Sequence, residues 1–183
     1  MDLQARGEEI LEKLFLPQGL EKIGEAYLVG NLALKTTVKP DIDIQIYSKP
    51  FSWEDNSRKI VEYFKKFGLT DYVCRKLKES NKDLTSFKYV FEDTTWNIDI
   101  TQTTPSDNYI QDAYRFYLKY IKLFTPQKTK TIRDLKTDFY KINMLHHSLS
   151  YYIYLAVLEN KAKDKNDILR YLKDHNIDLK RFK

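Results

Sequence analysis

Two aspartates separated by one residue, Asp41 and Asp43, carry the strongest chemical signal in the sequence. They alternate with Ile42, Ile44 and Ile46, and this period of two predicts a strand with one apolar and one polar face. Both carboxylates therefore point to the same side, where two like charges repel unless a cation lies between them. Carboxylate oxygens are the ligands that Mg²⁺ prefers. The pattern predicts a magnesium site on this strand.

A third carboxylate, Asp99, lies in the same kind of pattern between Ile98 and Ile100. Three carboxylates suit a pair of metal ions about 3.5–4 Å apart, which hold the attacking and leaving oxygens in phosphoryl transfer. Asp99 joins Asp41 and Asp43 only if the two strands are neighbours. Strand order is not visible in the sequence, so this pairing is an expectation.

A turn at Gly30 and Asn31 precedes the paired aspartates. Glycine lets the backbone approach a ligand closely, and the N–H groups of a helix that starts at Asn31 would attract an anion. Asparagine is also a good N-cap, and taken alone the pair favours this structural role. Lys35 and Lys39 follow the turn, where a cation would meet a triphosphate. Solvated loop lysines are the alternative.

The order and spacing of these residues resemble the signature of the polymerase-beta-like nucleotidyltransferase superfamily. Gly30-Asn31, then nine residues, then Asp41-Ile42-Asp43, and later Ile98-Asp99-Ile100 match its turn, its acidic pair and its distal acid. The resemblance covers roughly residues 20–104. The family normally has glycine or serine at the position of Asn31, whose amide is bulkier but still donates a hydrogen bond.

The resemblance implies roles for these residues. Asp41, Asp43 and Asp99 would be catalytic and would bind two Mg²⁺ ions, and Asp99 would also help to deprotonate the acceptor hydroxyl. Gly30 and Asn31 would hold the phosphates of a nucleoside triphosphate. From its position in the loop, Lys39 is a further candidate for nucleotide binding.

The predicted function is metal-dependent transfer of a nucleoside monophosphate from a nucleoside triphosphate, ATP among them, to an acceptor hydroxyl, with release of pyrophosphate. We expect a small-molecule acceptor such as an antibiotic, because the helical part of the chain could wall a compact pocket. One alternative is a minimal nucleotidyltransferase that acts on a protein or on transfer RNA. Another is a non-catalytic module that binds a nucleotide or nucleic acid.

Elements of two kinds surround these residues. Short β-rich runs alternate with helical stretches up to about residue 104, and helical spacing dominates afterwards. The sequence therefore predicts an α+β protein, a small mixed sheet flanked by helices, with a catalytic core at 1–104 and a helical region at 105–183. The expected strands are 26–29, 41–46, 71–77, 86–91 and 96–101, and the expected helices are 3–15, 53–67, 106–124, 132–160 and 164–175.

The amino-acid composition limits the classes of protein to which the chain can belong. Of the 183 residues, 42% are hydrophobic and 31% charged, which excludes a disordered chain. The apolar runs are too short to span a membrane, and the N-terminus lacks a signal-peptide pattern. A single cysteine, Cys74, predicts a reducing cytoplasm and a buried side chain. The net charge is +5, and residues 161–183 carry eight Lys or Arg against four Asp. This basic tail would attract nucleic acid, or it would form the solvent-exposed surface of a helix. The sequence does not indicate the oligomeric state.

Overall fold

The computed structural model describes residues 2–49, 52–77, 82–106, 108, 112–145 and 148–178. The chain divides into two compact units, Met1–Leu118 and Lys119–Lys183. Each unit is described here by itself. None of the helices formed by the described ranges has the length and apolar character needed to cross a membrane.

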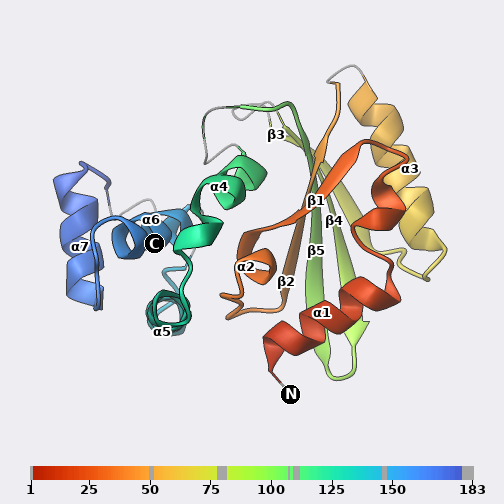
Figure 1. Ribbon diagram of the computed structural model, residues 1–183. Coiled ribbons are helices and arrows are strands. Elements are labelled where there is room, and N and C mark those ends of the chain that lie inside the picture. Colours follow the sequence, from red (N-terminus) through yellow and green to blue (C-terminus); the bar gives the residue numbers. More distant parts are fainter. Residues whose placement is uncertain are drawn as a thin grey trace. The chain divides into compact units, whose positions relative to one another are not determined.

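The first unit contains a mixed five-stranded sheet in the order β1-β2-β5-β4-β3 (Figure 1). Its strands are β1 (Glu25–Val29), β2 (Asp41–Tyr47), β3 (Tyr72–Leu77), β4 (Lys82–Phe91) and β5 (Thr94–Thr103). The central neighbours β2 and β5 run parallel, whereas every other pair is antiparallel. The α+β class and the mixed sheet predicted from the sequence are confirmed.

The two faces of the sheet differ as the alternation in β2 predicts. Ile42, Ile44 and Ile46 are completely buried, and burial of each such side chain stabilises the fold by about 1.5–3 kcal/mol. Helices α1 (Leu3–Lys13) and α3 (Trp53–Lys65) pack on this isoleucine face (Figure 1). The opposite face carries the aspartates of β2 and β5.

Short helical turns complete the first unit. A 3₁₀ helix, η1 (Gln18–Leu20), precedes β1, and the four-residue α2 (Gly30–Ala33) leads from β1 toward β2. The expected first helix ends before residue 15, because Phe15 has a φ of 50°, which a right-handed helix does not allow.

The prediction that Cys74 is buried is wrong, because β3 is an edge strand and the thiol is exposed.

The helical part of the chain is more broken than the sequence predicts. Its elements are α4 (Ala113–Tyr120), η4 (Ile121–Leu123), α5 (Pro126–Lys141), α6 (Leu149–Leu158) and α7 (Lys165–Asp174). The single helix expected at 132–160 is wrong, since α5 stops at Lys141 and Asn143 takes a left-handed φ of 55°. His146 and His147, expected inside that helix, lie outside the described residues.

The helix expected at 106–124 starts later, at Ala113. By sequence either Asp107 or Ser106 could cap this helix, and Asp107 lies outside the described residues. Instead, the Asp112 carboxylate accepts a hydrogen bond from the backbone N–H of Arg115 at 3.0 Å, which is the geometry of an N-cap. The domain boundary expected after residue 104 stays a prediction, and the compact first unit extends to Leu118.

Candidate active site

Parallel pairing of β2 with β5 brings the three predicted carboxylates together. Asp43 lies directly opposite Asp99 in the register, and Asp41 lies one pleat away on the same face, opposite Asn97. One carboxylate oxygen from each of Asp41, Asp43 and Asp99 lies within 4.8 Å of the other two. Within the described residues this is the one group of His, Cys, Asp and Glu side chains so arranged. The residue types and the spacing are those of a site for hard divalent cations.

The polar atoms of the cluster test whether a cation fits there. Asp99 Oδ1 is buried and has no hydrogen-bond partner in the part of the chain that the structure describes. A buried carboxylate oxygen without a donor is costly, and binding of a metal ion would remove this cost. The donor set, three carboxylates on two adjacent strands, therefore fits Mg²⁺.

The turn at Gly30 contacts the cluster directly. Gly30 has a φ of +67°, a conformation that side chains disfavour. A Cβ atom at this position would lie 2.2 Å from Asp43 Oδ2. Only glycine therefore lets the chain turn this close to the carboxylate, and the space beside Asp43 stays free of side-chain atoms from residue 30.

Lys39 lies at the other side of the cluster. Its Nζ forms an ion pair with Asp41 Oδ2 at 2.8 Å, while Asn97 Nδ2 donates to Asp41 Oδ1 at 3.4 Å. Burial lowers the pKa of the Lys39 ammonium, but attraction to Asp41, Asp43 and Asp99 outweighs burial and holds this pKa above its usual value. Lys39 therefore stays charged beside the carboxylates.

Asn31 has a different place from the one expected for a cap. The N-cap of α2 is Val29, and Asn31 is the second helical residue and is buried. Its carbonyl accepts a hydrogen bond from the backbone N–H of Thr36 at 2.9 Å. The side chain of Lys35 is exposed, and its backbone φ is 55°.

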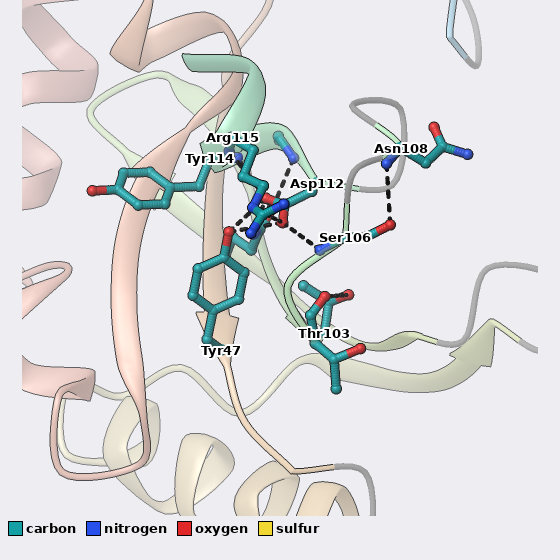
Figure 2. Close-up of polar contacts among 10 residues, drawn as sticks. Tyr47, Thr103, Ser106, Asn108, Asp112, Tyr114 and Arg115 are labelled. Atoms are coloured by element: carbon teal, nitrogen blue, oxygen red, sulfur yellow. Dashed lines mark hydrogen bonds and ion pairs between the residues drawn. The ribbon is translucent and has the colours of Figure 1, made fainter. Parts of the chain in front are cut away.

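A fourth carboxylate, Asp112, is completely buried on the same face of the sheet (Figure 2). Its oxygens accept hydrogen bonds from Gln45 Nε2 at 2.9 Å and from the Tyr47 hydroxyl at 2.7 and 2.8 Å. The backbone N–H groups of Ser106 and Arg115 each donate at 3.0 Å. These bonds tie the start of α4 to β2, two to four residues beyond Asp43.

The same contacts fix the charge of Asp112. Burial would raise its pKa, but hydrogen bonds from Gln45, from the backbone of Arg115 and Ser106 and from Tyr47 together hold the pKa below its ordinary value. Burial and the hydrogen bond to this carboxylate raise the pKa of Tyr47. Asp112 is therefore an ionised anchor, and its oxygens are occupied by donors.

Sequence reasoning missed Asn97, Lys88 and Asp112. Asn97 lies two residues before Asp99, so the alternation that places Asp99 on this face also places Asn97 there. Lys88 Nζ donates to Asn97 Oδ1 at 3.1 Å, a contact that requires the β4–β5 register. No local pattern marks Asp112, whose donors come from four separate positions.

Comparison with solved structures identifies the fold. Cid1 poly(U) polymerase with MgGTP bound matches at a TM-score of 0.54 and 16% identity, over 85% of this chain and 49% of that one. The poly(A) polymerase complex GLD-2–GLD-3 matches at 0.60 and 11%, over 99% and 62%. Terminal uridylyl transferase 4 from Trypanosoma brucei with bound CTP matches at 0.54 and 15%, over 96% and 52%.

This chain is similar in fold to the polymerase-beta-like nucleotidyltransferases. The cluster of Asp41, Asp43 and Asp99 has the Asp-x-Asp pair and the distal aspartate on which the sequence resemblance rests. The chain spans between 49% and 62% of the length of these structures. No protein-family model matches the sequence, and no curated protein matches it. The likeness to these solved structures is therefore one of fold.

Proposed function

We propose that the protein transfers a nucleoside monophosphate from a nucleoside triphosphate to an acceptor hydroxyl and releases pyrophosphate. The observation that supports this most strongly is the cluster of Asp41, Asp43 and Asp99, with the buried, unpartnered Oδ1 of Asp99. Solved structures of similar fold contain bound MgGTP and MgATP. Asp112, whose oxygens are saturated by donors, belongs to the scaffold.

Each residue of the site would have a distinct task. The three aspartates would hold two Mg²⁺ ions, whose charge would neutralise the triphosphate and the leaving pyrophosphate. Asp99 would accept the proton of the acceptor hydroxyl while the oxygen of that hydroxyl forms a bond to the α-phosphorus. The bond between the α-phosphorus and the oxygen that bridges the α- and β-phosphates would break, and pyrophosphate would leave. The turn at Gly30 would leave room for phosphate beside Asp43.

For the acceptor we propose the 3′-hydroxyl of an RNA strand. Structures of similar fold include a poly(U) polymerase and a cytoplasmic RNA terminal U-transferase. The registers place two exposed cations on the face that carries the triad: Lys88 in the row of Asp41, and Arg75 in the row of Gln45. If an RNA strand crosses β4 and β3, its phosphates would contact the positive charges of these two side chains. The cytoplasmic location and the small-molecule acceptor expected from the sequence stay predictions.

A labelled-transfer experiment tests the reaction and the acceptor together. The purified chain is incubated with each α-³²P-labelled nucleoside triphosphate, Mg²⁺ or Mn²⁺, and one acceptor. The acceptors are an RNA oligonucleotide with a free 3′-hydroxyl, the same oligonucleotide with a 3′-phosphate, transfer RNA, and pooled aminoglycosides and lincosamides. We expect label on the free 3′-hydroxyl and none on the blocked strand.

Two variants separate catalysis from contamination. Asp43→Asn removes one carboxylate of the cluster, and Asp55→Asn makes the same exchange at an exposed position on α3. Transfer should disappear in the first variant and persist in the second. Label on the antibiotics instead of RNA would support the small-molecule acceptor. Nucleotide binding without transfer to any acceptor would support a non-catalytic module.

A further inference from the structure

The carboxylate cluster contains its own counter-cation. Three carboxylates within 4.8 Å repel one another, and Lys39 supplies a positive charge to Asp41 at 2.8 Å. Asn97 engages the other oxygen of Asp41. Both oxygens of Asp41 are thus bound by protein groups, whereas Oδ1 of Asp99 is not.

The backbone fixes where the Lys39 side chain starts. Pro40 follows Lys39, and a residue before proline is restricted to extended conformations. The carbonyl of Pro40 accepts a hydrogen bond from the Asn97 backbone N–H at 3.0 Å, which continues the pairing of β2 with β5. The main chain at this point is therefore held, but the four-carbon stem of lysine is flexible and its side chain is 38% exposed.

We propose that Lys39 is an exchangeable counter-cation, bound to Asp41 in the metal-free protein and transferred to a phosphate of the nucleotide when metal and nucleotide bind. This role rests on the proposed function. A divalent ion and an ammonium that share one carboxylate oxygen repel each other, so Lys39 must leave Asp41 Oδ2 for a metal to use it. The triphosphate offers the displaced ammonium new negative charge within reach of the same stem.

The proposal predicts effects of opposite sign on two ligands. Lys39→Met keeps an unbranched side chain of nearly the same length and removes the charge. Without the competing ammonium, the affinity for Mn²⁺ alone should rise about fivefold or more. The affinity for a nucleoside triphosphate in the presence of saturating metal should fall by a similar factor, because its phosphate loses a cation. A merely structural lysine would not shift the two affinities in opposite directions.

Mn²⁺ binding followed by electron paramagnetic resonance, and calorimetric titration with a non-hydrolysable triphosphate, measure the two effects on the full chain. Lys59→Met, at an exposed position of α3, makes the same change of net charge away from the cluster and should leave both affinities unchanged. Lys39→Arg keeps the charge and should change Mn²⁺ affinity less than Lys39→Met. Thermal melts of each variant check that it is folded.

The outcomes separate this proposal from the proposed function. If wild type binds Mn²⁺ and Lys39→Met binds it equally or more weakly, the exchange is wrong and the metal site stands. If Mn²⁺ binding is the same in wild type and in Asp43→Asn, the carboxylates are not a metal site, and both proposals fail. Opposite shifts in Lys39→Met, absent from Lys59→Met, would establish the exchange.

Discussion

Two carboxylate environments lie on one face of the same sheet and differ in how their oxygens are satisfied. Asp112 is completely buried and accepts hydrogen bonds from two side chains and two backbone N–H groups. Asp99 Oδ1 is also buried, but it has no donor among the described residues. The first environment, drawn in Figure 2, holds the start of α4 on β2, whereas the second leaves a buried carboxylate oxygen that a ligand could bind.

The difference shows how a structural acid and a candidate catalytic acid are told apart on one scaffold. A buried carboxylate stabilises a fold when donors saturate it, and it costs stability when they do not. Asp41, Asp43 and Asp99 add mutual repulsion to that cost. Substitutions in the cluster should therefore lower activity more than stability, and substitution of Asp112 should lower stability more than activity.

Between the two carboxylate environments, the larger loss of activity is expected from Asp99→Asn, which keeps the shape of the side chain and removes its charge. Turnover should fall at least about 100-fold, as is usual when a general base is lost. The melting temperature of the metal-free protein should stay the same or rise, because repulsion within the cluster decreases. Transfer rates at saturating nucleotide and thermal melts measure both quantities. Near-normal turnover would leave two essential carboxylates and overturn the three-acid mechanism.

Asp112→Asn should show the reverse pattern. The amide cannot accept all the hydrogen bonds that the carboxylate accepts, so the free energy of unfolding should fall by about 2–3 kcal/mol. At a temperature where the variant is folded, turnover should fall far less than in Asp99→Asn. Urea denaturation and transfer assays compare the two variants, with Asp55→Asn as the control. A loss of activity equal to that of Asp99→Asn, in folded protein, would remove the distinction between the sites.

The acid sensitivity of the Asp112 anchor has a defined sign. Because its pKa is lowered in the folded protein, the unfolded chain binds more protons as the pH falls. The stabilisation is complete above the unfolded pKa of about 3.9 and is lost as the pH falls through the folded pKa. The difference in unfolding free energy between wild type and Asp112→Asn should be constant above pH ~5 and shrink below pH ~4. Urea melts across this range test it, and a difference independent of pH would contradict it.

A smaller effect is expected from Gly30→Ala. The left-handed φ costs about 1–2 kcal/mol with any side chain, and the new Cβ would also displace Asp43 Oδ2. Gly68→Ala is a matched control, since Gly68 has a φ of +78° and a Cβ there meets no atom within 4 Å. Both variants should lose stability, but only Gly30→Ala should weaken Mn²⁺ binding. Equal Mn²⁺ affinities would separate the turn from the site.

The smallest effect is expected from Asn31→Ser. Serine is the usual residue of the resembling family at this position, and α2 begins at Gly30 without a side-chain cap from Asn31. Nucleotide affinity should stay within about threefold or improve, since either side chain donates a hydrogen bond to phosphate. Calorimetric titration with a non-hydrolysable triphosphate measures it. A tenfold loss would assign Asn31 a specific role that serine cannot fill.

Much of the first unit was predictable from local patterns. The alternation in β2 predicted the strand, its buried isoleucines and the common face of Asp41 and Asp43, because strand periodicity is a property of the backbone alone. The turn at Gly30 was also predicted from a local property, the conformational freedom of glycine. The breaks in the helical region were not predicted, because left-handed residues such as Asn143 leave little trace in apolar spacing.

By itself the sequence determined which residue types could bind a metal and on which face of their strands they lie. The tertiary structure alone decided that β5 pairs in parallel with β2 and that Asp43 lies opposite Asp99. It also decided that Lys39 and Asn97 each contact one oxygen of Asp41. Strand order depends on how all five strands and their covering helices bury apolar surface together, which no local pattern contains. The chemistry is therefore encoded locally, but the assembled site follows from long-range packing.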